Sequence, residues 1–121
     1  MKINIETKTV LPVEIGDLKF EIKLDDEGLN KILNQYESTL EKMKAAQKGT
    51  IESANEGLKI AVDFFLGDGA YDKIYDKYKS FMVCEEITYQ LFIEVAEELE
   101  QRNLKLVDNA KAKKYLAKVK R

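Results

Sequence analysis

The chain has 121 residues and 45% hydrophobic content, which suffices for a single domain with one modest core. Charged residues make up 35% of the chain but the net charge is only −2, which is typical of a solvated folded surface and excludes a disordered polyelectrolyte. Because the chain contains no histidine, the usual proton shuttle near neutral pH is missing and most hydrolase triads are excluded.

The N-terminal part alternates between apolar and polar residues, which predicts strands. The apolar positions are Ile3, Ile5, Val13, Ile15, Leu18, Phe20, Ile22 and Leu24. Gly16-Asp17 suits a type II′ turn or a slightly longer loop with a bulge, so we expect a hairpin over residues 12–24. Pro12 lacks an amide donor and belongs at a strand start or at an edge, where no ladder bond is lost.

Beyond Leu24 the apolar period becomes that of amphipathic helices. The first helix is expected over about residues 26–48, and its apolar positions are Leu29, Ile32, Leu33, Tyr36, Leu40 and Met43. The second is expected over residues 50–66, and its apolar positions are Ile51, Ala54, Leu58, Ala61, Val62, Phe65 and Leu66. Asp25 and Asp26 favour the start of the first helix, and Thr50 or Ser53 can cap the second.

The stretch FFLGDGAYDKIYDKY, residues 64–78, could be an ion site, a phosphate loop or a junction between helices. We predict a junction, in which Gly67 ends the second helix and Asp68 caps a third helix over residues 69–79. Its aromatic stripe of Tyr71, Ile74, Tyr75 and Tyr78 is typical of a core face. A calcium loop is disfavoured because Asp72 and Asp76 alternate with lysines and lack the order of an EF-hand.

A fourth helix is expected over residues 80–102, with two apolar stripes. The first stripe is a seam at three- and four-residue steps, made of Phe81, Cys84, Ile87, Leu91, Val95 and Leu99. The second comprises Met82, Tyr89, Ile93 and Ala96. This is more apolar surface than a small domain needs, so the helix is either buried centrally or binds a partner, and the second stripe is the candidate partner-binding site.

Charge is segregated along the chain. Residues 81–101 contain six glutamates and no Lys or Arg, whereas residues 103–121 contain seven Lys and Arg against Asp108 alone. We interpret 1–102 as one globular domain and 103–121 as a basic, partly flexible tail. Such a tail could neutralise nucleic-acid phosphates, but the acidic body and the lack of a recognised reading motif favour a solvated end.

Several absences limit the possible functions. Neither GxxxxGK[ST] nor GxGxxG occurs, and nothing indicates a cleft with perturbed carboxylates, so we expect no cofactor, no metal and no enzymatic activity. No apolar run approaches the roughly 20 residues of a membrane helix. The lone cysteine, Cys84, fits a reducing compartment, so we expect a cytoplasmic protein.

The segment VEIGDLKFEIKL, an acidic helix start, and GLKIAVDFFLGDGAYDKIYDKY leading into a long acidic helix resemble tail assembly chaperones of phages and prophages of Gram-positive bacteria. The resemblance spans about residues 13–102. Its most distinctive element is carried by Leu66-Gly67, Ala70 and Ile74-Tyr75. The first dozen residues lie outside the pattern.

This resemblance implies a small, mainly helical protein without enzymatic activity. Such chaperones bind the phage tape measure protein and keep it soluble while tail tube subunits polymerise around it, and many also exist in a longer, frameshifted form that recruits tube protein. The expected partners are therefore the tape measure protein and the tail tube protein, in the cytoplasm of the host bacterium. Exposed apolar stripes would also favour homo-oligomers.

Two other functions remain open at this stage. A head-tail connector should form a defined ring on its own, and a nucleic-acid-binding regulator should bind DNA through its basic tail in a salt-dependent way. All three functions are compatible with the same fold class, which is α+β and mainly α, with an N-terminal β-hairpin followed by four helices.

Overall fold

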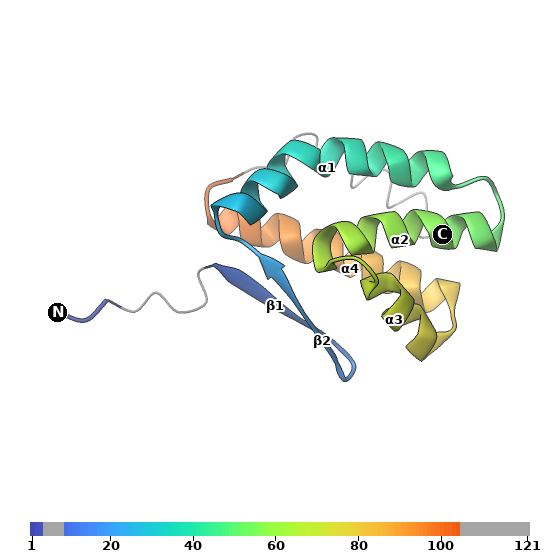
Figure 1. Cartoon of the computed structure of the whole chain (residues 1–121), viewed down its shortest axis with the longest axis horizontal. Helices are drawn as coiled ribbons and strands as arrows, with labels where there is room; N and C mark the ends of the chain where they lie inside the picture. Colours follow the sequence, from blue (N-terminus) through green and yellow to red (C-terminus); the bar gives the residue numbers. More distant parts are fainter. Residues whose placement is uncertain (4–8, 105–121) are drawn as a thin grey trace.

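The computed structural model describes residues 1–3 and 9–104, and it is an α+β fold that is mainly α (Figure 1). The elements are β1 (Val10–Ile15), β2 (Leu18–Lys23), α1 (Asp26–Ala46), α2 (Ile51–Leu66), α3 (Ala70–Tyr78) and α4 (Phe81–Gln101). The predicted hairpin and four helices are confirmed, each boundary within a few residues. α1 and α2 run antiparallel, with α4 behind them and the hairpin below the helices in this view (Figure 1).

The two strands form an antiparallel hairpin closed by a two-residue turn. Ile15 pairs with Leu18, so Gly16 and Asp17 are the central turn residues. Gly16 has a φ of +60° whereas Asp17 is not among the residues with positive φ, a combination that distinguishes type II′ from type I′. The predicted type II′ turn is therefore confirmed.

Pro12 lies within β1, because the strand begins at Val10, two residues before the predicted start. The amide of Leu24 donates to the carbonyl of Thr9 at 2.7 Å. Hydrogen-bonded pairs alternate along an antiparallel ladder, so the pair of Pro12 with Glu21 is a non-hydrogen-bonded one. Pro12 thus faces the open edge of the hairpin and costs the ladder no bond, as expected from the missing donor.

α1 starts directly after β2. The side chain of Asp25 caps it by accepting a hydrogen bond from the amide of Gly28 at 2.9 Å. The buried residues of α1 are Ile32, Tyr36, Thr39, Leu40 and Met43, and all but Thr39 belong to the predicted apolar stripe. The other two residues of that stripe, Leu29 and Leu33, are half-buried against the core. Thr39 is accommodated because its hydroxyl donates to the carbonyl of Gln35 at 2.7 Å.

α2 begins with a capping box between Thr50 and Ser53, so both predicted capping residues take part. Leu58, Ala61, Val62 and Phe65 are buried as predicted. The prediction was wrong for Ile51, which is 70% exposed. It occupies the first position of α2.

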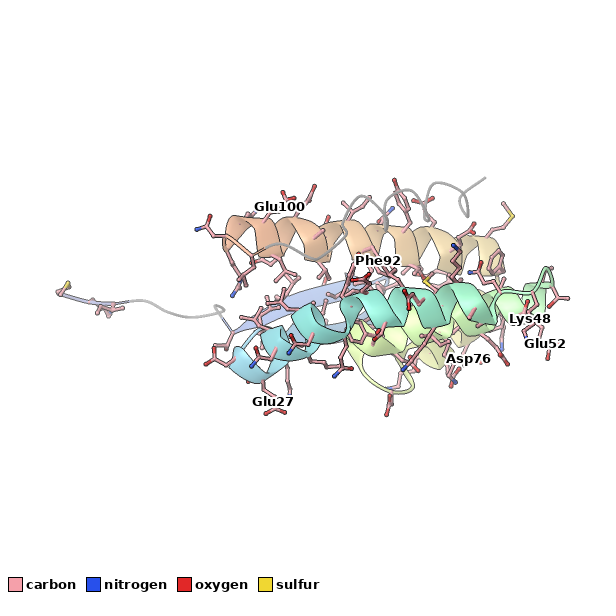
Figure 2. All side chains as sticks on the ribbon, turned by 90° about the horizontal axis from the view of Figure 1, so that it is seen from above. Glu27, Lys48, Glu52, Asp76, Phe92 and Glu100 are labelled. Atoms are coloured by element: carbon pink, nitrogen blue, oxygen red, sulfur yellow. The ribbon has the colours of Figure 1, made fainter. Side chains whose placement is uncertain are left out.

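Three aromatic rings from different helices meet in the core: Tyr36 of α1, Phe65 of α2 and Phe92 of α4. Phe92 lies edge-on to both other rings, at centroid distances of 5.9 Å and 5.2 Å. Figure 2 shows its side chain on the side of α4 that faces the other helices. Such edge-to-face pairs favour association beyond the area they bury, so this cluster fixes how the three helices pack.

α4 ends in a Schellman motif. Asn103 adopts a φ of +62°, and the amide of Leu104 donates to the carbonyl of Leu99 at 2.8 Å. Leu104 is half-buried and packs against the core, so the ordered packing continues to this residue. The predicted basic tail, apart from Asn103 and Leu104, lies outside the described residues.

Candidate partner-binding surface

α4 turns one continuous face to the core. Its buried residues are Cys84, Thr88, Leu91, Phe92, Val95 and Leu99. Four of the six predicted seam positions are among them, and Phe81 and Ile87 are half-buried against the same cluster. The seam therefore packs mainly within the domain, and the second of the two predicted stripes is the candidate surface for a partner.

The residues of the second stripe, here called the α4 stripe, are Met82, Tyr89, Ile93 and Ala96. At 3.6 residues per turn they fall within a sector of roughly 60° around the helix axis. Met82 is 77% exposed, whereas the other three are half-buried. Tyr89 and Ala96 pack against the core cluster, and Ile93 does not belong to that packed set. Met82 and Ile93 are thus the members that contribute least to the core.

Val83 is an exposed apolar residue of α4 that the sequence patterns did not single out. It is 40% exposed and lies next to Met82 in the chain, but about 100° further around the helix. No periodic stripe contains it, because its neighbours one turn away, Lys79 and Ile87, differ in polarity. In the structure, Val83 faces a groove that it lines together with residues of β1.

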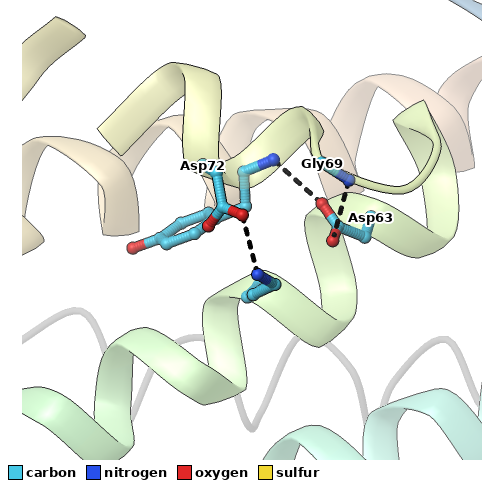
Figure 3. Close-up of polar contacts among 5 residues, drawn as sticks. Asp63, Gly69 and Asp72 are labelled. Carbon is cyan, nitrogen blue, oxygen red and sulfur yellow. Dashed lines mark hydrogen bonds and ion pairs between the residues drawn. The ribbon is translucent and has the colours of Figure 1, made fainter. Parts of the chain in front are cut away.

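The junction between α2 and α3 is held by Asp63, one turn before the end of α2. Its carboxylate accepts hydrogen bonds from the amide of Tyr71 at 2.9 Å and from the amide of Gly69 at 3.3 Å (Figure 3). Amides in the first turn of a helix have no partner within the helix, so a carboxylate placed here satisfies them and complements the helix dipole. Asp63 therefore caps α3 from the preceding helix.

This arrangement corrects the prediction that Asp68 caps α3. α2 ends at Leu66 and Gly67 follows it, as predicted, but Gly67 has a φ of +103° and a ψ of 159° and is not in the left-handed helical conformation. α3 starts at Ala70, one residue after the predicted start, and Gly69 occupies the capping position in place of Asp68. Asp68 is exposed. A signal for Asp63 was present in the sequence, since it is the one charged residue in the apolar run AVDFFL.

Replacing Asp63 with alanine should lower the free energy of unfolding by about 1–2 kcal/mol, because two amides of the α3 start lose their acceptor. The matched control, Asp68→Ala, should change it by less than about 0.5 kcal/mol, as expected for an exposed residue without a cap bond. Urea denaturation followed by circular dichroism measures both. A larger loss for Asp68→Ala than for Asp63→Ala would contradict the assigned cap.

The aspartates of α3 are engaged by lysines. Asp72 pairs with Lys59 of α2 at 2.8 Å, as Figure 3 shows, and Asp76 pairs with Lys79 at 2.9 Å. The ammonium group of Lys79 lowers the pKa of Asp76 through a hydrogen bond and its charge. Within residues 1–3 and 9–104, no three Cys, Asp or Glu side chains are grouped so that they could hold a metal ion. The two carboxylates are thus paired with two different lysines.

Cys84 is buried against α3. Burial raises the pKa of its thiol, and the nearby hydroxyl of Tyr71 offsets only part of this rise. The hydroxyl of Tyr71 donates to Oδ1 of Asn55, which ties α3 to α2. A buried thiol with a raised pKa is a poor nucleophile, so Cys84 acts as a core residue.

No protein-family model matches the chain, and neither a curated protein nor a solved structure shows significant similarity to it. Among the described residues, no helix has the length and apolar character needed to cross a membrane.

Proposed function

We propose that this protein is a phage tail assembly chaperone, which binds the tape measure protein and assists assembly of the tail tube in the host cytoplasm without catalysing a reaction. Two lines of argument support the proposal. The first is the resemblance carried by the hairpin segment and by Leu66-Gly67, Ala70 and Ile74-Tyr75. The second is the character of the α4 stripe.

The observation that carries the proposal is the exposure of the α4 stripe at Met82. A methionine that is 77% exposed contributes little to folding, yet its flexible, polarisable side chain adapts to apolar partners. Ile93 lies three turns further along the same side of the helix and outside the packed core set. A long helical partner can lay its apolar face along such a stripe, as amphipathic helices do in many complexes.

Substitution of Met82 and Ile93 by serine tests this function. Co-expression with the tape measure protein, followed by a pull-down and a solubility assay, should show at least a tenfold loss of binding for the double variant. Ile51→Ser is the matched control, because Ile51 is a similarly exposed apolar residue on α2. It should bind like wild type. A melting temperature within a few degrees of wild type confirms that each variant folds.

Three outcomes would contradict the proposal. A folded double variant that solubilises the tape measure protein as well as wild type would exclude the α4 stripe as the contact. A stable ring formed by the chain alone would favour a head-tail connector. Salt-dependent DNA binding in place of tape measure binding would favour a regulator.

A further inference from the structure

A groove of about 530 Å³ runs between β1 and α4, on the flank of α4 opposite to the α4 stripe. Its apolar lining includes Leu11, Pro12, Val13 and Ile15 of β1, Tyr78 of α3, and Val83, Ile87 and Leu91 of α4. Val83, which no sequence stripe explained, is therefore part of a wall made of residues from three elements.

The charged residues that line the groove are acidic, and Lys77, which lies beside Gly16 at one end of it, is paired with Asp17 at 2.7 Å. Its lining contains Glu14 and Glu94 together with the polar Gln90, and no Lys or Arg among the described residues. α4 itself carries six glutamates and no basic residue over its 21 positions. An occupant with lysine or arginine beside its apolar face would complement these carboxylates, whereas an acidic one would be repelled.

The backbone of β1 argues against a strand as the occupant. Because Pro12 and Glu21 form a non-hydrogen-bonded pair, the groups of β1 that point to the open edge belong to Val10, Pro12 and Glu14. Pro12 removes the central donor of this edge. An added strand would therefore lose a ladder bond in its middle, and proline at an edge is a known means of blocking such pairing.

We propose that the groove between β1 and α4 binds an amphipathic α-helix of a partner protein that carries lysine or arginine beside its apolar face. Helix binding needs apolar side chains in the groove but no backbone bonds from β1, so Pro12 does not impair it. The proposal goes beyond the function proposed above, because it concerns another flank of α4 and does not depend on the identity of the partner.

The test uses two labelled synthetic peptides of 18 residues with the same leucine face, one flanked by lysines and the other by glutamates. Fluorescence anisotropy with the intact protein should show binding of the lysine peptide at least tenfold tighter than of the glutamate peptide. Val83→Ser should weaken binding of the lysine peptide about fivefold to tenfold. Met82→Ser, a change at the adjacent exposed position outside the groove, should leave it unchanged.

Charge-reversal variants test the charge preference of the groove in a second experiment. Glu94→Lys should weaken binding of the lysine peptide and strengthen that of the glutamate peptide, while Glu100→Lys, which adds the same charge outside the groove, should have much less effect. Glu100 lies on the far side of α4 from the other helices in Figure 2. Since Glu94 is exposed, the substitution should not disturb folding.

The proposal would be overturned by absent binding of both peptides, by equal binding of both, or by equal effects of Val83→Ser and Met82→Ser. A dimer detected by analytical ultracentrifugation that Val83→Ser dissociates would assign the groove to a second copy of the chain and would also overturn it. Loss of tape measure binding in the Met82 and Ile93 double variant with unchanged peptide binding would support both proposed surfaces separately.

Discussion

Replacing Phe92 with alanine is expected to lower the free energy of unfolding by about 3–5 kcal/mol, the range found when a buried phenylalanine is truncated. Phe92 is 2% exposed and its ring contacts Tyr36 and Phe65 edge-on, so the substitution removes contacts to two other helices at once. Because domains of this size are stable by only about 5–15 kcal/mol, the variant should be close to unfolding at 37 °C.

Urea denaturation followed by circular dichroism measures this loss. Phe64→Ala is the matched control, since Phe64 is half-buried and its neighbours are Phe65 and the side chain of Lys31. Phe64→Ala removes the same atoms at a position with fewer buried contacts, so the free energy of unfolding should fall by only about 1–2 kcal/mol. A smaller loss for Phe92→Ala than for Phe64→Ala would show that the core is not centred on the Tyr36, Phe65 and Phe92 cluster.

Gly28→Ala is expected to destabilise the protein by about 2 kcal/mol or more, although alanine is the better helix former by about 1 kcal/mol. A Cβ atom on Gly28 would lie 2.1 Å from the carbonyl oxygen of Lys23, a backbone atom that cannot rotate away. The end of β2 therefore passes against the first turn of α1 at a distance that only glycine allows. The substitution should push the hairpin away from α1.

Asn30→Ala is the control for this experiment. Asn30 is exposed two positions further along α1, so the substitution raises helix propensity without a clash and should stabilise the protein by a few tenths of a kcal/mol. Thermal unfolding of both variants gives the comparison. Should Gly28→Ala raise the melting temperature as Asn30→Ala does, the close approach of β2 to α1 would be contradicted.

The elements themselves could be predicted because their signals are local. Alternation from Val13 to Leu24 and the Gly16-Asp17 pair define a hairpin within a dozen residues. The stripe from Ile32 to Met43 defines the buried face of α1 in the same way. The caps by Asp25 and Thr50 join residues three positions apart, so they too could be predicted from the sequence.

The cap of α3 was missed because its contact is not local in this sense. Asp63 reaches the amide of Tyr71, eight residues away, only because the chain turns back sharply at Gly67 and Gly69. The exposure of Ile51 was missed for a related reason, since helical period identifies a face but not how far a neighbouring element covers it. The cap of α3 and the exposure of Ile51 both depend on where the helices end relative to one another.

The sequence by itself determined the hairpin, the four helices, their order and the apolar faces that must be buried, because these follow from periodicity and from residues close together in the chain. Only the tertiary structure decided that the seam of α4 packs inside, that Met82 stays exposed, and that β1 and α4 enclose a groove beside Val83. Those outcomes depend on the angles and distances between elements, which many weak contacts set together and no short stretch of residues encodes.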